Sequence, residues 1–390
     1  MVDESEALSR ILARAIPLEP APMPLLEAAG MFLAEPIRAR VAHPRFDNST
    51  VDGYAVRAED GVTERRIIGE QPAGLDRNLR LEKNESSRIY TGAPLPQNGT
   101  AVVMQEDVEI HGERLILREP VATGENIRRT GADVAAGQLI ASAGDRLTPQ
   151  LIGLLASQGM QNVTVHRRPR VTILSTGDEL RPPGTDVNSG EIYESNSFLL
   201  AALLQSLGLS AEIRHSRDIP PEVESEIRRA LESSDVLIIS GGVSVGDHDH
   251  VRPALISSGV AVDLWRIRMK PGKPLAFGHM GEKLVFGLPG NPVSSFVTFL
   301  VMVRPALLQM LGARDNDRFL RQIPMQLDCV LENPSDRPHY VRGRMKNGRF
   351  VPQGLQESHA LFGLSQSDAL LRMEPGERIQ HGDTLPIFVW

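Results

Sequence analysis

Residues 235–249 read DVLIISGGVSVGDHD, an apolar run that passes directly into small residues and acids. A run without polar alternation is typical of a strand buried on both faces, as in a parallel sheet covered by helices. Glycines at the end of such a strand let the backbone approach a ligand closely. The stretch therefore predicts one strand of an α/β domain, with a binding site at its carboxyl end.

Neighbouring segments between residues 170 and 312 contain similar apolar runs that predict further strands. Apolar runs alternate with helical patterns in the order RVTILST (170–176), NSFLLAALLQSLG (196–208), PPEVESEIRRALESS (220–234), DVLIIS (235–240) and KLVF (283–286). Strands that alternate with helices predict a doubly wound, mostly parallel sheet. In the first of these helices we expect Asn196 or Ser197 to cap the N-terminus and Gly208 to end the helix.

The flanking segments have other patterns. Residues 5–16 and 24–35 predict two short helices, and short apolar runs separated by Gly, Pro and Asn predict an all-β insertion. Residues 317–390 predict a small β-barrel or sandwich. The expected fold class is α/β plus β, in four domains: a small N-terminal helical/β domain (1–37 and 137–169), a β-rich insertion (38–136), an α/β domain (170–316) and a C-terminal β-barrel (317–390).

Composition excludes several classes of protein. The formal net charge of −7 over 390 residues does not favour general nucleic-acid binding. Cys329 is the single cysteine, so we exclude an intrachain disulfide and expect a reducing compartment, the cytoplasm. The longest apolar stretch, residues 292–311, is interrupted by Arg304 and Pro305, so we expect a buried helix there and no membrane span. The acidic start of the chain does not resemble a secretory signal.

Three loops rich in glycine and serine follow strong strands: STGDEL (175–180), SGGVSVGDHD (240–249) and GLPGNP (287–292). Backbone N–H groups in such turns and at helix starts bind phosphate or carboxylate oxygens. The carboxyl ends of parallel strands meet at one edge of a sheet, so we expect one anionic-ligand site there. Its candidate binding residues are Ser240, Gly241, Gly242, Pro289, Gly290 and Asn291.

Acids in these loops suggest a cation. Asp178, Asp247 and Asp249 would repel a bound phosphate unless a cation lay between them, and Mg²⁺ takes one or two carboxylates together with phosphate oxygens. The alternative is that some of these acids cap helices or hold turns, and for Glu191 and Glu194 the two interpretations are equally open. We interpret His248 and His250 as exposed loop residues in preference to metal ligands.

A basic turn, RIRMKPGKPLAFG (266–278), places Lys270 and Lys273 on either side of Pro-Gly, with Pro274 next. Two ammonium groups on a stiff turn can bind an oxyanion, although a solvated hairpin is the alternative. The β-rich segment has three polar turns whose convergence the spacing alone does not establish: FDNSTVDGYAVR (46–57), YTGAPLP (90–96) and NIRRTGADV (126–134).

Taken together, these motifs resemble the molybdopterin molybdenumtransferases, the family of bacterial MoeA and the gephyrin E domain. The resemblance runs in the family's order over nearly the whole chain: DNSTVDGYAVR, TGAPLP, NIRRTGADV, STGDEL, SGGVSVGDHD, MKPGKP and GLPGNPVS. It implies an enzyme that takes adenylylated molybdopterin and molybdate, releases molybdenum cofactor and AMP, and needs Mg²⁺. It also implies a homodimer whose cleft combines the α/β domain of one subunit with the β-insertion of the other, and a partner adenylyltransferase upstream.

The resemblance also implies roles for individual residues. Catalytic roles fall to Asp52, Thr91, Asp133, Asp178 and Asp249, and metal binding to Asp178, Asp247 and Asp249. Substrate binding falls to Arg128, Glu191, Ser240, Gly241, Gly242, Pro289, Gly290 and Asn291, and molybdate binding to Lys270, Lys273, Pro274, Arg342 and Ser358. The chain departs from the family at Thr50-Val51, where Ala-Met is commoner, and at His248, where Tyr is commoner.

Two other functions are compatible with parts of this pattern. A molybdopterin adenylyltransferase would use a similar α/β domain with SGG loops, but it would not need the insertion or the barrel. A non-enzymatic scaffold or cofactor carrier would need partner-binding extensions. No Ser-His-Asp arrangement is evident and Cys329 lies within a strand pattern, so we expect no covalent nucleophile.

Overall fold

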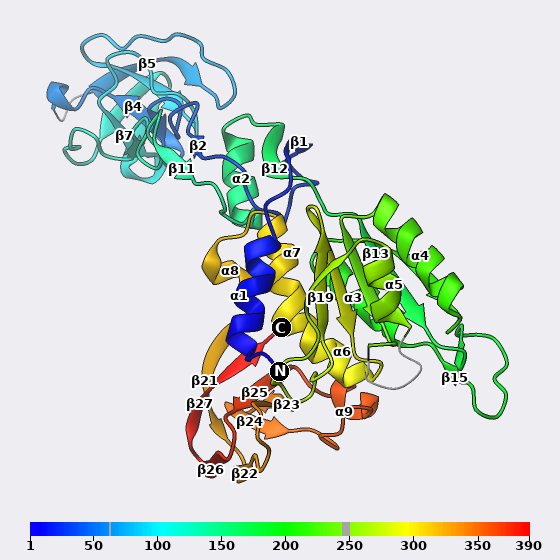
Figure 1. Ribbon diagram of the computed structural model, residues 1–390. Coiled ribbons are helices and arrows are strands. Elements are labelled where there is room, and N and C mark those ends of the chain that lie inside the picture. The colour runs from blue at the N-terminus through cyan, green and yellow to red at the C-terminus, as the bar shows by residue number, and fades with distance from the viewer. Residues whose placement is uncertain (62–63, 244–249) are drawn as a thin grey trace. The chain divides into compact units, whose positions relative to one another are not determined.

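The computed structural model describes residues 1–61, 64–243 and 250–390 (Figure 1). The chain forms two compact units. The first contains Met1–Glu35, Ala143–Gly153 and Met160–Trp390, and the second contains Pro36–Ser142 and Leu154–Gly159.

A six-stranded sheet forms the centre of the first unit. Its strands lie in the order β16 (Ala211–Ser216), β13 (Val171–Thr176), β17 (Val236–Ser240), β20 (Lys283–Leu288), β19 (Ala276–Met280) and β18 (Ala261–Leu264). The first four are parallel to one another, and β19 and β18 are antiparallel to their neighbours. Every residue of β13 and β17 is buried, as expected for strands covered on both faces. The predicted mostly parallel sheet is confirmed.

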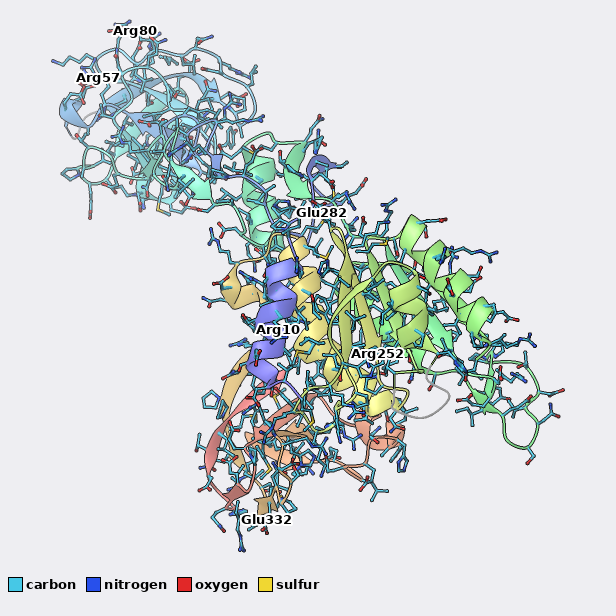
Figure 2. The ribbon with its side chains drawn as sticks, viewed as in Figure 1. Arg10, Arg57, Arg80, Arg252, Glu282 and Glu332 are labelled. Carbon is cyan, nitrogen blue, oxygen red and sulfur yellow. The ribbon has the colours of Figure 1, made fainter. Side chains whose placement is uncertain are left out.

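Helices cover this sheet on both faces. The chain runs from β13 through α3 (Asn196–Ser206) to β16, and returns through α4 (Pro220–Ser233) to β17 on the other side of β13. Parallel crossovers are right-handed, so these two helices lie on opposite faces. Helix α5 (Val251–Ser257) packs beside α4 (Figure 1). Arg252 of α5 (Figure 2) lies over the Trp265 ring, 5.1 Å from its centroid, and so fastens this helix to the segment after β18.

The long apolar stretch is a buried helix, as predicted. It consists of α6 (Pro292–Thr298), a π-helical turn (Phe299–Val303) and α7 (Arg304–Met310). Arg304 and Pro305, which interrupt the apolar stretch in the sequence, form the first residues of α7, directly after the π-helical turn. Among the described residues, Pro292–Met310 is the one helix long and apolar enough to cross a membrane, and 83% of its apolar window is buried in the protein.

The N-terminal part of this unit differs from expectation. Helix α1 (Glu4–Arg14) is present, but residues 24–35 form no helix. Instead β1 (Pro20–Pro24) pairs antiparallel with β12 (Asn162–His166), and turns follow. The alternating prolines of β1 lack N–H donors, which an edge strand tolerates and a helix interior does not.

A closed five-stranded barrel ends the chain, which decides between the predicted barrel and sandwich. Its strands are β21 (Arg321–Leu327), β24 (Arg349–Pro352), β23 (His339–Lys346), β25 (Ala369–Met373) and β27 (Thr384–Val389). Leu327, Val341 and Phe350 are among its core residues. Gly343 is required because a Cβ there would lie 2.3 Å from the Phe350 ring.

The second unit is the predicted β-rich insertion. Its six-stranded sheet has the order β7 (Ala101–Met104), β4 (Gly53–Val56), β6 (Glu85–Ile89), β5 (Glu64–Gln71), β9 (Arg114–Leu117) and β8 (Val108–His111). Adjacent residues of β4 belong to separate apolar clusters, as expected for side chains on opposite faces of a sheet. Val56 packs in the cluster that contains Leu115, and Ala55 packs in the cluster that contains Ile89. Short pairs join β2 (Ile37–Arg38) to β11 (Leu139–Ala141) and β3 (Asn48–Ser49) to β10 (Ile127–Arg128). Helix α2 (Pro149–Ser157) follows the insertion.

Candidate active site

The three glycine-rich loops meet at one edge of the central sheet, as the sequence predicted. They line a cavity of about 430 Å³ at the carboxyl ends of β13, β17 and β20. Thr176 comes from the first loop, Ser240, Gly241 and Gly242 from the second, and Pro289, Gly290 and Pro292 from the third.

The pair Gly241-Gly242 cannot carry side chains. Both residues have positive φ angles, 94° and 64°. A Cβ on Gly241 would lie 2.8 Å from the Thr176 carbonyl oxygen, and one on Gly242 would lie 2.5 Å from a Val251 methyl group. The backbone therefore passes close to its neighbours and leaves the cavity free for a ligand.

The start of helix α6 contacts the barrel. Asn291 precedes the helix, and its side-chain amide donates to Ser358 Oγ at 2.9 Å. The Val293 N–H donates to the Ser358 carbonyl at 3.0 Å. The structure thus brings together two predicted site residues that are far apart in the sequence.

Arg342 holds this barrel loop. Its side chain is almost fully buried, and it donates to the carbonyl groups of Leu355, Glu357 (3.2 Å) and Ala360 (3.0 Å). Burial lowers the pKa of the Arg342 guanidinium. Three carbonyl partners place the arginine behind the loop that carries Ser358, so it supports that loop from within the barrel.

The basic turn is fixed to barrel strand β23. The Lys270 N–H donates to the Pro338 carbonyl at 2.8 Å, and the Tyr340 N–H donates to the Lys270 carbonyl at 2.7 Å. Lys270 is partly buried, Lys273 is exposed, and Pro274 lines the cavity.

Several cations surround His339 beside this turn. His339 is 8% exposed, and its pKa falls to about 4 because of burial and then the positive charges of Lys270, Arg342 and Arg337. The ring is therefore neutral near pH 7, and the positive potential at this end of the barrel suits an oxyanion.

Carboxylates gather at the end of β16. Asp178 is exposed, and its Oδ1 accepts the Asp218 N–H at 3.2 Å. Burial raises the pKa of Asp218, and the negative charges of Glu179 and Asp178 raise it further. Asp218 and Glu179 line the cavity, and the sequence reasoning missed both. The available signal for Asp218 was its position directly after a fourth parallel strand.

Oxygen donors of this kind suit Mg²⁺, which needs only one or two carboxylates when phosphate supplies further ligands. Within residues 1–61, 64–243 and 250–390, no group of three or more His, Cys, Asp or Glu side chains could hold a metal by itself. Asp247, His248 and Asp249 lie outside the described residues. His250 precedes α5, and its charge lowers the pKa of Asp218.

Glu191 and Glu194 have structural partners. Glu191 accepts the N–H of Asn188 at 2.8 Å, which lowers its pKa, and pairs with Arg181 at 2.5 Å. Glu194 is buried and accepts the Ser197 N–H at 2.8 Å.

Helix α3 follows Ser195, so the expectation that Asn196 or Ser197 caps it is wrong. The Glu194 carboxylate caps the helix instead, because an acid near a helix N-terminus accepts the free N–H groups there. Gly208 ends the helix with a φ of 73°, as predicted.

The three polar turns of the insertion converge within the second unit. Asp52 Oδ1 accepts both the N–H and the hydroxyl of Thr91, each at 2.8 Å, and these bonds lower the pKa of Asp52. Asp47 accepts from the Thr130 N–H at 2.8 Å and from Arg129 at 2.7 Å. Residues of all three turns are thus hydrogen-bonded partners.

Arg128 and Asp133 are exposed in this unit. The sequence reasoning missed Arg88, whose guanidinium lies 5.0 Å from the Tyr54 ring centroid and 5.1 Å from that of Tyr90. The positive charge of Arg88 also contributes, after the hydrogen bonds from Thr91, to the lowered pKa of Asp52.

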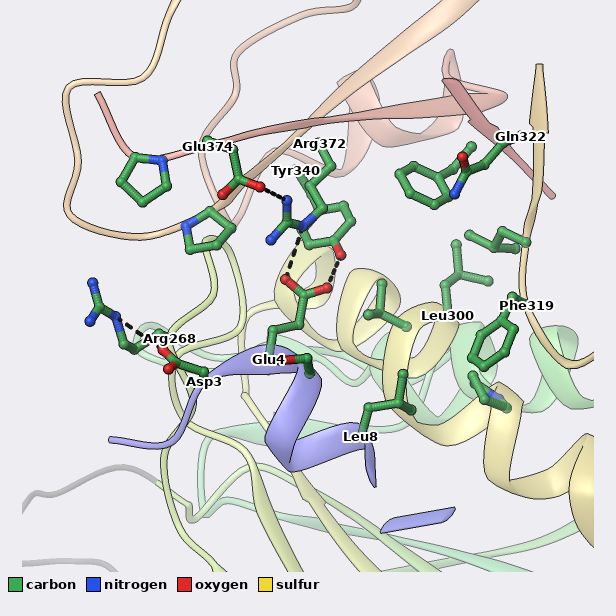
Figure 3. A pocket seen from close by; sticks show the side chains of 17 residues that line it. Asp3, Glu4, Leu8, Arg268, Leu300, Phe319, Gln322, Tyr340, Arg372 and Glu374 are labelled. Atoms are coloured by element: carbon green, nitrogen blue, oxygen red, sulfur yellow. Dashed lines mark hydrogen bonds and ion pairs between the residues drawn. The ribbon is translucent and has the colours of Figure 1, made fainter. Parts of the chain in front are cut away.

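A larger cavity of about 630 Å³ lies between α1, α7 and the barrel (Figure 3). At one end Glu4 accepts hydrogen bonds from the Tyr340 hydroxyl and from Arg372 Nε at 3.1 Å. This cavity lies away from the glycine-rich loops, so we place the candidate site at the sheet edge.

Comparison with known proteins agrees with this geometry. Three family models match: the MoeA N-terminal region (domain I and II) over residues 2–159, a probable molybdopterin binding domain over 172–309, and the MoeA C-terminal region (domain IV) over 325–390.

Curated relatives match over almost the whole chain. Molybdopterin molybdenumtransferase 2 of Mycobacterium tuberculosis is 34% identical over 95% of each chain. Molybdopterin molybdenumtransferase of Haemophilus influenzae is 38% identical over 96% of each. The crystal structure of the molybdopterin biosynthesis MoeA protein of Pyrococcus horikoshii is 30% identical, covers 100% of both chains and has a TM-score of 0.86.

Proposed function

The chain belongs to the MoeA family of molybdopterin molybdenumtransferases, and on this premise we propose how its residues bind adenylylated molybdopterin and molybdate and release molybdenum cofactor and AMP. The protein is a transferase of molybdenum cofactor biosynthesis. The observation that carries the proposal is the meeting of three glycine-rich loops, the basic turn and the Ser358 loop around one sheet edge.

The glycine-rich loops bind the phosphate groups of the pterin substrate. Gly241 and Gly242 present backbone that no side chain covers, and Ser240 supplies a hydroxyl beside them. Pro289, Gly290 and Asn291 bring the third loop to the same cavity edge.

The basic turn binds molybdate. Lys270 and Lys273 offset the charge of the dianion, Ser358 offers a hydroxyl, and Arg342 holds the loop on which Ser358 lies. Neutralising the oxyanion lowers its repulsion with the anionic dithiolene sulfurs of the pterin, which must approach it closely.

Mg²⁺ is the proposed cofactor. Asp178 and Asp218 are its candidate ligands among the described residues, and the family resemblance adds Asp247 and Asp249. Burial, and then the negative charges of Glu179 and Asp178, raise the pKa of Asp218, and a divalent cation would relieve that like-charge repulsion. When bound, the ion polarises the phosphate joined to AMP and favours its cleavage. The protein carboxylates would hold the ion in place, whereas Glu191 is paired with Arg181.

A homodimer in the cytoplasm is also proposed. The single cysteine, Cys329, whose thiol pKa is raised by burial, agrees with a reducing compartment. Asp52, Thr91, Arg128 and Asp133 of one chain are proposed to serve the sheet-edge site of a second chain, as the family resemblance implies.

Release of AMP tests the proposal. Purified protein is given adenylylated molybdopterin with and without molybdate, and with Mg²⁺ or a chelator. We expect AMP release that needs both molybdate and Mg²⁺. The alternative, adenylyltransferase activity, predicts instead that molybdopterin and ATP yield adenylylated product. Absence of both activities would favour a carrier or scaffold.

A further inference from the structure

Two buried polar atoms in the sheet-edge cavity have no hydrogen-bond partner among the described residues. They are Asn196 Oδ1 and Thr176 Oγ1, whose residues are 9% and 5% exposed. Both residues line the cavity. Buried polar groups are normally hydrogen-bonded, so unpaired ones at a binding site point to a missing ligand.

The orientation of the Asn196 amide is fixed by its neighbours. Its Nδ2 donates to the Gly290 carbonyl at 2.7 Å and to Ser240 Oγ at 2.9 Å. A carbonyl oxygen only accepts, so the nitrogen must face Gly290 and the oxygen must face elsewhere. The two N–H groups join the second and third glycine-rich loops, and Oδ1 is the acceptor that the side chain has left for a ligand.

An apolar shelf adjoins this acceptor. Tyr193 and Phe198 are 49% and 55% exposed, and with Pro183 they border a hollow of about 310 Å³. Tyr193 also lines the sheet-edge cavity, so this residue borders both the hollow and the cavity. The Tyr193 hydroxyl donates to the Thr185 carbonyl at 2.9 Å, which holds the ring in one orientation. Exposed aromatic faces beside a polar cavity suit a planar ring ligand.

We propose that Asn196 and Tyr193 form the subsite for an amino-bearing heteroaromatic ring of the substrate. Asn196 Oδ1 accepts a hydrogen bond from the ring's N–H donor, and the Tyr193 ring packs against its face. The subsite rests on the proposed function, because adenylylated molybdopterin carries two such rings, a pterin and an adenine. Thr176 Oγ1 donates to an acceptor of the same ligand.

A purely structural role does not account for Asn196. Glu194, not Asn196, caps the first turn of α3, and the bonds to Ser240 and Gly290 use Nδ2 alone. A structural role would leave the buried Oδ1 without a partner among the described residues, whereas a ligand N–H satisfies it.

Paired ligands measure the hydrogen bond directly. One pair is AMP and purine riboside 5′-monophosphate, which lacks the amino group; the other is pterin and 2-deaminopterin. We expect wild-type protein to prefer the amino-bearing member of one pair by about tenfold or more, because a lost partner leaves Oδ1 unpaired. In Asn196→Ala this ratio should fall to about one, and the affected pair identifies the ring. Asn162→Ala, an exposed change on β12, should keep the wild-type ratio.

The shelf gives a second variant in case Asn196→Ala does not fold. Tyr193→Ala should weaken binding of the same ligand by about tenfold, and Tyr193→Phe, which keeps the ring, should bind nearly as wild type. Unchanged ratios in folded Asn196→Ala, or an unchanged Kd in Tyr193→Ala, would overturn the subsite. Failure of the proposed function is a different result: no molybdate-dependent AMP release by wild-type protein.

Discussion

The side-chain amide of Asn291 donates to Ser358 Oγ at 2.9 Å, which ties the start of helix α6 to the barrel. The Val293 N–H reinforces this tie through the Ser358 carbonyl. The barrel loop is thereby held at the edge where the glycine-rich loops end. The proposed oxyanion site and the proposed phosphate-binding loops are connected by these two hydrogen bonds, an arrangement that would position two substrates for reaction.

Ser358→Ala should therefore weaken molybdate binding selectively. We expect the KM for molybdate to rise by about fivefold to tenfold with little change in the KM for the pterin substrate, because one hydroxyl bond is lost. Steady-state AMP release measures both constants. Ser365→Ala, which changes an exposed serine of helix α9 (Leu361–Ser365), is the control. Equal changes in both KM values would contradict the assignment of Ser358 to the oxyanion.

Lys270→Ala should lower activity more strongly, because it removes a charge that offsets the molybdate dianion. We expect kcat/KM for molybdate to fall by about a hundredfold. Lys346→Ala, at the exposed end of β23, serves as a matched loss of charge. Equal activity in the two variants would mean that the turn is only a solvated hairpin.

Asp52→Ala should fold normally and lose activity, because Asp52 is exposed and bonds mainly to Thr91. Mixing this variant with Lys270→Ala tests whether two chains share a site. Random assembly of dimers regenerates one intact site in four, so about a quarter of wild-type activity should return. If the mixture stays as inactive as its parents, each site is confined to one chain.

Asp235 should stabilise the start of β17. Burial raises its pKa, but hydrogen bonds from Arg167 (2.7 and 3.1 Å) and Arg170 outweigh burial and hold the pKa well below its usual value. This stabilisation is fully present above the unfolded-state pKa, about 3.9, and is lost gradually as pH falls from there through the much lower folded-state pKa.

Asp235→Asn should then cost about 2 kcal/mol at pH 7 and somewhat less at pH 3, where the loss of the stabilisation has only begun, as measured by urea unfolding. Asp186→Asn, in an exposed loop, should have almost no effect at either pH. A cost for Asp235→Asn that did not depend on pH would contradict the ionic account.

His339 should stay neutral over the physiological range. Its pKa of about 4 reflects burial and then Lys270, Arg342 and Arg337. The unfolded chain takes up this proton near pH 6.5 and the folded protein only near pH 4, so stability rises with pH across that window. NMR titration of the ring, assigned by comparison with His339→Gln, checks this; a pKa near 6.5 would contradict it.

The sequence predicted the α/β sheet because its central strands are uninterrupted apolar runs. Such runs need to be buried on both faces, as strands in a parallel sheet covered by helices are. It failed at residues 24–35, where apolar residues at helix-like spacing form a series of turns after the edge strand β1. Strand ends also located the three glycine-rich loops, since parallel strands bring their carboxyl ends together.

Other parts of the site depended on tertiary contacts. Asp218 is a single acid after β16, and only packing shows that it shares an environment with Glu179 and Asp178. Arg342 was expected beside the oxyanion, but no local pattern reveals that three loop carbonyls surround it. The hydrogen bond between Thr91 and Asp52 joins residues far apart in the sequence, and only the folded sheet of the insertion brings them together.

Location of molybdate by anomalous scattering tests the central claim most directly. Crystals of the protein soaked with molybdate are measured at the molybdenum edge. The account predicts a peak within about 5 Å of the Lys270 ammonium, the Lys273 ammonium or Ser358 Oγ, because the molybdate oxygens that accept their hydrogen bonds lie between donor and metal. A peak elsewhere, with both lysines facing bulk solvent, would contradict it.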